Sequence, residues 1–207
     1  MRSKPEDQYI KFMTETYGSL RNEFDFTNNF TELDLGCGKG SFTTQLGLKF
    51  PEHLIFAADI MIGRLRKLQK RNQREGISNI HPIRVEARHL IAMIPDNSID
   101  RLHILCPDPW PKDKHRANRL MCSDFMAQIH RIIKTGGHFH FSTDDMQYHD
   151  IVRNVVSKSG LFEENSELLA ELKEIKSDFE IRWNSQGKEV HHFLWVAKPL
   201  PSYTSVH

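Results

Sequence analysis

Short apolar segments alternate along the chain with longer amphipathic segments. Segments of strand length, in which apolar residues are continuous or alternate with polar ones, are residues 33–35, 53–59, 80–85, 99–106, 138–142 and 190–196. Segments with apolar residues at helical spacing lie between them, at about 41–50, 61–75, 125–133 and 151–160. Strands that alternate with helices are typical of a parallel sheet covered on both faces. We therefore predict an α/β fold with a Rossmann-like, doubly wound, mostly parallel seven-stranded sheet and a mixed edge beyond residue 160.

Glycine and proline mark the expected boundaries of these elements. Gly76 and Gly160 follow two of the helical segments, where glycine readily takes the left-handed conformation that ends a helix. The glycine pair at 136–137 is expected to close a third helical segment in the same way. Pro82 lies inside a strand segment and cannot donate a ladder hydrogen bond, which predicts a strand at the edge of the sheet.

Composition fits one domain of ordinary size. The chain has 207 residues, of which 39% are hydrophobic and 27% charged, and this balance is typical of a globular protein. We expect one domain at residues 31–207, preceded at 1–30 by a lead-in that is helical or partly disordered when nothing is bound. No apolar run reaches transmembrane length and the first residues are polar, so we expect a cytoplasmic protein without a membrane partner. Three widely spaced cysteines without a C-x-x-C pair agree with a reduced compartment.

Charge is segregated along the chain, although the formal net charge is only +1. Residues 64–74 and 112–119 are basic, whereas residues 163–180 are rich in acidic side chains. The basic side chains of 64–74 share one helical face, and such a face is more often solvated than bound to RNA. The net charge therefore decides nothing about nucleic acid, and the local runs matter more.

A glycine-rich loop joins the first strand segment to the first helical segment. Gly36, Gly38 and Gly40 give the spacing G-x-G-x-G, whereas the dinucleotide fingerprint G-x-G-x-x-G would need glycine at the place of Ser41. Glycine lets the backbone approach a ligand closely and take positive φ. The spacing resembles that of S-adenosylmethionine-dependent methyltransferases of the Rossmann-like class. This resemblance makes S-adenosylmethionine the expected cofactor.

Acidic residues stand at or near the ends of three successive strand segments: Asp34, Asp59 and Glu86. In the class that the loop resembles, Asp34 would lie near the ammonium group of the cofactor, and Glu86 would face the adenine amino group. Asp59 lies roughly 20 residues beyond the loop, where an acidic side chain can accept hydrogen bonds from both ribose hydroxyls. The three acids together favour cofactor binding over an ordinary turn with a helix cap.

The segment at 107–112, Pro-Asp-Pro-Trp-Pro-Lys, follows the apolar run at 99–106. Its prolines cannot continue a central strand or a helix, so the chain must turn at the carboxyl edge of the sheet, where open α/β folds bind ligands. The carboxylate of Asp108 beside the indole of Trp110 suits a flat, nitrogen-rich ring, and the basic run that follows suits phosphate. The segment therefore indicates chemistry on a nucleotide base within a polynucleotide.

These motifs occur in the order found in one enzyme family. The glycine loop, Asp59, the Pro-Asp-Pro-Trp segment, Ser142-Thr-Asp144 and Ser177-Asp-Phe-Glu180 resemble the tRNA (guanine-N7-)-methyltransferase family of the bacterial TrmB type. The resemblance runs from about residue 31 to 198; Pro-Asp-Pro-Trp is its specific part, and the glycine loop is generic. It implies methyl transfer from S-adenosylmethionine to N7 of guanine at position 46 in the variable loop of tRNA.

The resemblance also implies roles for individual residues. The cofactor site would be formed by Asp34, Gly36, Gly38, Gly40, Asp59, Glu86 and Asp108. Asp108 would also be the catalytic residue. The tRNA substrate would contact Lys112, Asp144, Ser177, Asp178, Phe179 and Glu180. Two positions depart from the usual pattern: Ser177 replaces threonine and keeps the hydroxyl, and Glu86 stands where aspartate is common.

Methylation at guanine N7 does not require a strong general base. N7 is an exposed lone pair that needs no deprotonation, so the alignment of N7, methyl group and sulfur dominates. The ring gains positive charge, and a carboxylate near guanine N1 and N2 would stabilise that charge and select guanine over adenine. Asp108 and Asp144 are the candidates for this carboxylate.

Other functions fit parts of the sequence. A methyltransferase for the amino group of adenine or cytosine is an alternative, because Pro-Asp-Pro-Trp loosely resembles the Pro-Pro-aromatic motif of those enzymes. A nicotinamide-dependent oxidoreductase is disfavoured by Ser41, and a non-catalytic RNA-binding module would retain the cofactor fold. No metal is expected, because His138 with His140 and His191 with His192 show no third ligand at usable spacing. We expect a monomer or a homodimer.

Overall fold

The computed structural model describes residues 4–12, 24–108, 120–165 and 170–200. Its strands are β1 (Lys11–Phe12), β2 (Thr31–Leu35), β3 (Leu54–Asp59), β4 (Ile80–Arg84), β5 (Ile99–Leu105), β6 (Ile133–Thr143), β7 (Phe162–Glu164) and β8 (His191–Ala197). Its helices are the 3-10 helix η1 (Pro5–Tyr9) and the α-helices α1 (Ser41–Lys49), α2 (Ile62–Glu75), α3 (Ala87–Met93), α4 (Ser123–Ile132), α5 (Met146–Ser159) and α6 (Asp178–Asn184).

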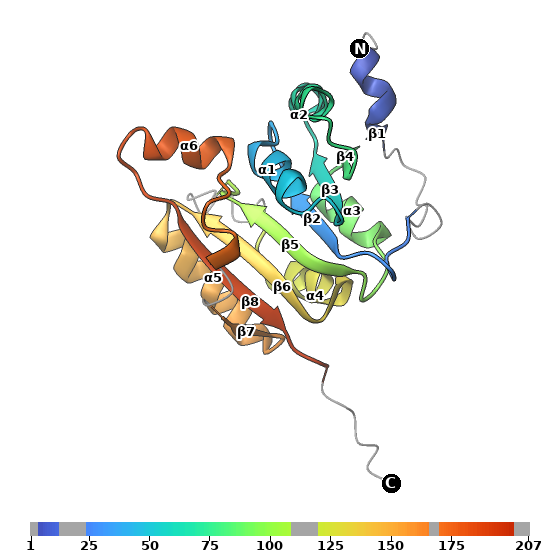
Figure 1. Cartoon of the computed structure of the whole chain (residues 1–207). Helices are drawn as coiled ribbons and strands as arrows, with labels where there is room; N and C mark the ends of the chain where they lie inside the picture. Colours follow the sequence, from blue (N-terminus) through green and yellow to red (C-terminus); the bar gives the residue numbers. More distant parts are fainter. Residues whose placement is uncertain (1–3, 13–23, 109–119, 166–169, 201–207) are drawn as a thin grey trace.

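One sheet organises the described residues, with the strand order β1-β4-β3-β2-β5-β6-β8-β7 (Figure 1). The strands from β1 to β6 are parallel to their neighbours, whereas β8 is antiparallel to both β6 and β7. The doubly wound sheet with a mixed edge is therefore confirmed. Within the described residues it has one strand more than predicted, the two-residue β1 from the lead-in segment.

The edge prediction made from Pro82 is wrong by one strand. β4 pairs with β3 on one side and with β1 on the other, so it is not the outermost strand. The pairing with β1 involves only Ile83 and Arg84 and leaves Pro82 beyond the end of the ladder on that side. The missing N–H of proline is thus tolerated because β1 is too short to reach it. The division into a lead-in at 1–30 and one domain at 31–207 stays a prediction.

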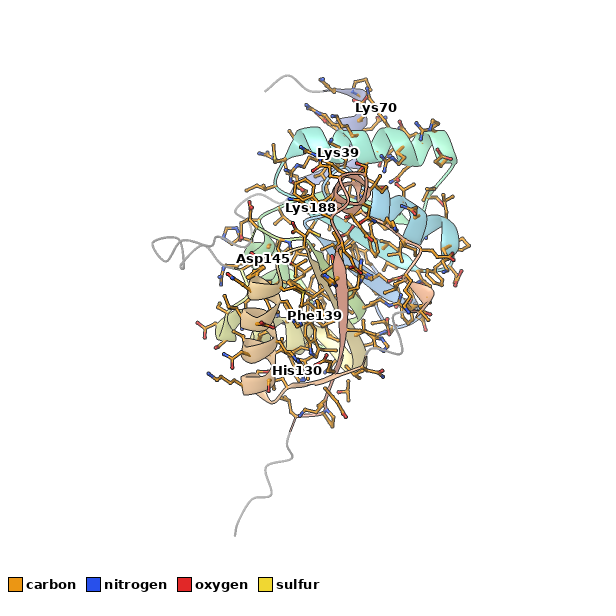
Figure 2. All side chains as sticks on the ribbon, turned by 90° about the vertical axis from the view of Figure 1, so that its left-hand side faces the viewer. Lys39, Lys70, His130, Phe139, Asp145 and Lys188 are labelled. Carbon is orange, nitrogen blue, oxygen red and sulfur yellow. The ribbon has the colours of Figure 1, made fainter. Side chains whose placement is uncertain are left out.

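The sheet separates two layers of helices. Helices α3, α4 and α5 cover one face, where Phe125 and Met126 of α4 join Leu102, Phe139 and Trp195 of the sheet in the larger core cluster. Helices α1 and α2 cover the other face, where α1, α2 and residues 170–175 form a smaller cluster. In Figure 2, labelled residues follow one another from the top of the view downward in the order Lys39, Lys188, Asp145, Phe139 and His130. Lys39 and Asp145 come just after β2 and β6, so they mark the edge at which the parallel strands end.

Glycine-based boundaries were predicted with mixed success. Gly76 and Gly160 end α2 and α5 in the left-handed conformation, with φ of 68° and 67°. The glycine pair at 136–137 does not close α4, because that helix ends at Ile132 and the glycines lie inside β6, at a register irregularity opposite β5. The hydrophobic pattern did not predict helices α3 and α6, because their residues show no clear helical spacing of apolar positions. Every described helix falls short of the length and apolar character that crossing a bilayer requires.

Candidate active site

An acidic side chain follows or ends each of five neighbouring parallel strands. In sheet order these are Glu86 after β4, Asp59 at the end of β3, Asp34 in β2, Asp108 after β5 and Asp144 after β6. Parallel strands bring their carboxyl ends to one edge, and ligands of open α/β sheets bind at that edge. The structure therefore places the predicted cofactor acids and two of the predicted substrate and catalytic acids in one row.

The glycine loop lies at the centre of this row, between β2 and α1. Gly36, Gly38 and Gly40 all have positive φ, at 86°, 60° and 78°. A Cβ added at Gly36 or Gly38 would meet no atom within 4 Å, so these two positions face open space. A Cβ at Gly40 would lie 2.9 Å from Cβ of Leu68, so this glycine serves close packing of the loop against α2. The loop thus combines an open side with a packed side.

Asp59 shapes the loop from the end of β3. Its Oδ2 accepts a hydrogen bond from the N–H of Gly38 at 3.1 Å, and its Oδ1 accepts one from the N–H of Met61 at 2.7 Å. Arg64, in the first turn of α2, donates from Nη1 to Oδ2 at 3.2 Å. The carboxylate is therefore held in place by two backbone groups and one cation, with its side chain only 3% exposed.

Asp34 is buried at the start of the loop. Thr43 of α1 donates a hydrogen bond from Oγ1 to Asp34 Oδ2 at 2.5 Å. Burial raises the pKa of Asp34 to about 7; the hydrogen bond from Thr43 opposes this rise, and the charges of Asp59 and Glu32 add to it. A nearby cation would stabilise its ionised form, because an opposite charge favours ionisation. The side chain is thus suited to receive an ammonium group.

Glu86 has a structural role at the start of α3. It is the N-cap residue, and its Oε2 accepts hydrogen bonds from the N–H groups of Arg88 at 2.9 Å and His89 at 3.2 Å. This is the capping role expected of an acid before a helix. The cap fixes the side chain at the edge of the row, where its predicted contact with adenine stays a prediction.

Asp108 is exposed just beyond β5, shortly after Cys106, whose backbone is strained. Cys106 has φ of +46°, and its N–H donates to the carbonyl oxygen of Ser142 in β6 at 2.9 Å. Burial raises the pKa of the Cys106 thiol to about 12; the Ser142 hydroxyl opposes this rise, and the charges of Asp144 and Glu180 add to it. The thiol therefore stays protonated, and its surroundings show that acids from β6 and α6 approach the turn that presents Asp108.

The predicted substrate segment folds as α6 and docks on the glycine loop. Ser177 caps the helix by accepting a hydrogen bond from the N–H of Glu180 at 3.0 Å. Asp178 accepts a hydrogen bond from the N–H of Ser41 at 3.0 Å, and its other oxygen lies 3.5 Å from Nη2 of Arg71. The segment expected to bind RNA is therefore joined directly to the first residue of α1.

A second link runs from α6 to the end of β6. Trp183 donates a hydrogen bond from its indole nitrogen to Asp144 Oδ2. The ring of Phe179, which is 38% exposed, lies 4.6 Å from the Trp183 ring, centre to centre. Glu180, in contrast, is buried, and its Oε2 lies 3.3 Å from Nε2 of His192 in β8. Of the predicted substrate residues that the structure describes, Phe179 and Asp144 are the exposed ones.

Part of the predicted site lies outside the described residues: Trp110, Lys112 and the remainder of the basic run to residue 119. The basic face of α2 is described, and it is largely neutralised. Arg64 pairs with Asp59, Arg71 with Asp178 and Arg74 with Glu75. Among the described residues, no group of three or more candidate ligands has the arrangement to hold a metal ion.

The chain resembles known methyltransferases. A family model described as "Putative methyltransferase" matches residues 28–193. A tRNA (guanine-N(7)-)-methyltransferase of Neisseria meningitidis serogroup C is 31% identical over 167 residues, which are 79% of this chain and 68% of the relative. The chain belongs to the tRNA (guanine-N7-)-methyltransferase family.

Other members of the family differ in length. The Thermotoga maritima member is 30% identical over 83% of this chain, which spans 55% of that protein. The Lachnoclostridium phytofermentans member is 29% identical over 91% of both chains. The solved structures of the 16S rRNA methyltransferase KamB and the antibiotic-resistance methyltransferase Kmr have TM-scores of 0.60 and 0.59, at 15% and 13% identity. KamB covers 87% of this methyltransferase and Kmr 90%, and at this identity the likeness concerns the fold alone.

Several residues of this methyltransferase site had no clear sequence signal. Thr43, Arg64 and Trp183 each hold a predicted acid, but from a helix whose position relative to that acid depends on the fold. Local spacing offers a hint only for Arg64, which follows Asp59 by 5 residues. His192 and its neighbours were visible as unusual histidines in strands, without an indication of their partners.

Proposed function

We propose that this protein transfers the methyl group of S-adenosylmethionine to N7 of guanine at position 46 in the variable loop of tRNA, acting in the cytoplasm. The observation that carries the proposal is the row of acids at the carboxyl edge of five neighbouring strands, in a chain of the tRNA (guanine-N7-)-methyltransferase family. The cofactor acids occupy one half of the row, and Asp108 and Asp144 occupy the other.

The residues of the first half fit S-adenosylmethionine. The open side of Gly36 and Gly38 leaves room for a ligand against the backbone. Asp34 is a buried carboxyl with a raised pKa, and it gains a counter-ion when an ammonium group binds. Asp59 has acceptor capacity for ribose hydroxyls beside the Gly38 N–H. Glu86 completes the set toward the adenine amino group.

The residues of the second half act on the guanine. S-adenosylmethionine, when bound, supplies a methyl group on a positively charged sulfur. Asp108 accepts hydrogen bonds from guanine N1–H and N2–H, with Asp144 beside it, and stabilises the positive charge that the ring gains. Because N7 attacks as a free lone pair, the side chains mainly orient the base. Phe179 offers an exposed ring beside Trp183 on which a base can stack.

Binding of tRNA rests on the basic run at 112–119, which follows Asp108 in sequence. Phosphate contacts position a nucleic acid without reading its sequence, and they make affinity fall with added salt. Replacing Lys114 and Arg116 by alanine should weaken tRNA binding and flatten its salt dependence, by about one phosphate equivalent per side chain at most. The neutralised face of α2 serves as the comparison, with Arg74→Ala as the control variant because Arg74 pairs with Glu75.

The decisive experiment measures which nucleoside is made. The purified protein is incubated with S-adenosylmethionine and an unmodified tRNA transcript that has guanine at position 46, and the nucleosides are analysed by mass spectrometry. N7-methylguanosine should form with this transcript and not with a matched transcript that has adenine there. Product that persists with adenine at position 46 would place the target elsewhere. Methylated adenine or cytosine would instead indicate the amino-methyltransferase activity.

A further inference from the structure

A continuous row of polar side chains crosses the sheet on the face that α1 covers. Glu32 of β2 contacts His103 of β5, from Oε2 to Nε2, at 2.8 Å. His103 contacts His140 of β6 between their Nδ1 atoms at 2.9 Å, and His140 Nε2 contacts His192 Nδ1 in β8 at 2.9 Å. We call Glu32, His103, His140 and His192 the histidine relay. It ends at Glu180 of α6, whose Oε2 lies 3.3 Å from His192 Nε2.

The relay is buried where the rest of the core is apolar. Glu32, His103 and His140 are each 0% exposed. The ring of Phe42 in α1 covers the two histidines, and its centre lies 4.8 Å from the centre of the His103 ring and 5.9 Å from that of the His140 ring. Buried polar groups are costly unless they are paired, and replacing such a network with apolar residues often leaves stability unchanged or higher. Stability alone therefore does not account for the relay.

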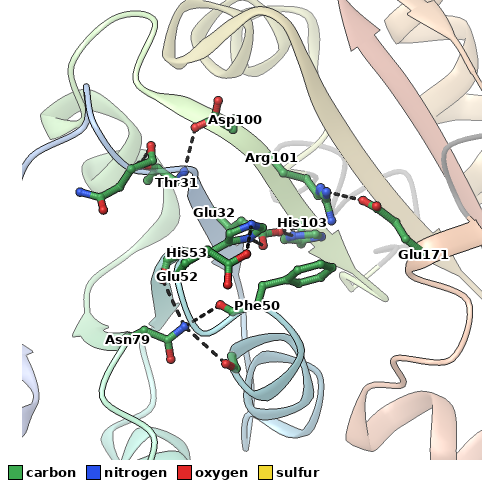
Figure 3. Close-up of polar contacts among 12 residues, drawn as sticks. Thr31, Glu32, Phe50, Glu52, His53, Asn79, Asp100, Arg101, His103 and Glu171 are labelled. Atoms are coloured by element: carbon green, nitrogen blue, oxygen red, sulfur yellow. Dashed lines mark hydrogen bonds and ion pairs between the residues drawn. The ribbon is translucent and has the colours of Figure 1, made fainter.

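The direction of the hydrogen bonds in the relay is set at Glu32. Burial raises the pKa of this carboxyl, but hydrogen bonds with His103 and His53 and the charge of Arg101 more than offset it and lower the pKa to about 2 (Figure 3). Glu32 is therefore ionised and can only accept, so His103 must carry a proton on Nε2. Burial lowers the pKa of His103, and it lowers that of His140 well below the ordinary value. Both rings are neutral and have one N–H each.

The positions of the other ring protons follow from the direction of the His103 hydrogen bond. His103 has a bare Nδ1, so His140 must donate from its own Nδ1 and is left with a bare Nε2. His192 must then donate from Nδ1 to His140. At the far end, the hydrogen bond to His140 orients the His192 ring so that its Nε2 faces Glu180 Oε2 at 3.3 Å.

We propose that the histidine relay positions Glu180 for the substrate. Glu180 Oε2 is in contact with His192 Nε2, and Oε1 is left as a hydrogen-bond acceptor for the target guanine. This inference rests on the proposed function for the identity of the base. His192 is thus a positioning residue, and His140 and His103 fix its orientation.

Tautomer measurement tests the relay without any reaction. The full protein is labelled with ¹⁵N-histidine, and long-range ¹⁵N–¹H correlation spectra identify which ring nitrogen carries the proton. His103 should be protonated at Nε2 and His140 at Nδ1. His130 is the control, because its Nε2 lies 2.8 Å from the carbonyl oxygen of Lys198 and must donate to it. A His140 protonated at Nε2, or averaged between the two forms, would overturn the relay even if the protein methylates tRNA as proposed.

Turnover measurement tests what the relay does. His140→Phe keeps a ring in the core and removes both hydrogen bonds, and His130→Phe makes the same change at a buried site on the other face of the sheet. His140→Phe should lower kcat for tRNA by about tenfold to a hundredfold, as expected for a misplaced group, with affinity for S-adenosylmethionine unchanged. His130→Phe should leave kcat unchanged. Equal kcat values in the two folded variants would refute the positioning role.

A compensating variant separates positioning from folding. Glutamine at position 192 can place its amide nitrogen where Nε2 of His192 lies, so it can donate to Glu180 without help from His140. The double variant His140→Phe/His192→Gln should therefore recover part of the kcat that His140→Phe loses. Absence of any recovery would contradict the role of the His192–Glu180 contact. If His140→Phe does not fold, the tautomer measurement on the unaltered protein still decides the relay.

Discussion

Asp178 accepts a hydrogen bond from the backbone N–H of Ser41 at 3.0 Å, although 137 positions separate the two residues. The carboxylate thus satisfies one of the unpaired N–H groups at the start of α1, where negative charge is favourable. The same residue begins α6, which contains Phe179 and Glu180. The glycine loop and the substrate segment are therefore joined through one side chain. A substitution in either segment should alter the structure of the other.

Asp178→Ala should weaken both halves of the site. Loss of the cap on α1 should lower the free energy of unfolding by about 1 kcal/mol, which is typical for a capping acid. Affinity for tRNA should fall more in the presence of S-adenosylmethionine than in its absence. Urea unfolding and binding titrations measure these effects, with Glu163→Ala, an exposed acid in β7, as the control. If the two variants unfold at the same urea concentration, the link contributes nothing.

Asp34→Asn should change how stability depends on pH. The pKa of Asp34 is about 7 in the folded protein, mainly because of burial, and lower in the unfolded chain. Between these two pKa values the folded state binds more protons, so the contribution of Asp34 to stability is greatest below the unfolded pKa and is lost as pH rises through about 7. Asparagine does not ionise, so the variant should not lose this stability as pH rises. The melting temperature of Asp34→Asn relative to the unaltered protein should therefore be higher at pH 8 than at pH 5.

The matched control for that series is Glu163→Gln, which removes an exposed charge and should show the same pH dependence as the unaltered protein. Parallel melting curves for Asp34→Asn and the unaltered protein across this range would mean that Asp34 is already ionised at low pH. The same variant should bind S-adenosylmethionine poorly, because it no longer supplies a counter-ion for the ammonium group.

Asp59→Ala should weaken binding of S-adenosylmethionine by about 1.5–3 kcal/mol, as expected for the loss of hydrogen bonds to a charged acceptor. Arg64→Ala removes the cation from the same carboxylate and leaves the acceptor in place, so it should retain most of the affinity. Calorimetry on both variants separates a ribose contact from a general effect on the loop. Equal affinities for Asp59→Ala and the unaltered protein would remove Asp59 from the cofactor site.

Asp108→Ala should abolish most methyl transfer while the protein stays folded. The side chain is exposed beyond β5 and has no part in the core. The loss should be about tenfold to a thousandfold if the carboxylate stabilises developing charge. Single-turnover rates with saturating tRNA and cofactor measure it, and the melting temperature verifies folding. Near-normal turnover would assign the charge-stabilising role to another acid, with Asp144 the first to examine.

Local sequence patterns were sufficient to predict the glycine loop and the acid at the end of β3. Gly36 and Gly38 have positive φ between β2 and α1, and Asp59 ends β3, so both features depend on neighbours between β2 and β3. The position of α6 depends on pairs such as Asp144 with Trp183 and Ser41 with Asp178, which no local spacing reveals. His140 was predicted on the correct strand period, yet its partners come from β5 and β8. Those contacts require the sheet order, in which β2 lies beside β5 and β8 beside β6.

The position of β8 has a consequence for synthesis of the protein. This strand, residues 191–197, lies between β6 and β7, which do not pair with each other in the sheet. A chain leaving the ribosome can assemble β1 to β6 early, but the edge of β6 stays open until the last strand emerges. His192 arrives on that strand. A nascent chain can therefore complete its cofactor loop before it can orient Glu180, and competence toward RNA should be the last property it acquires.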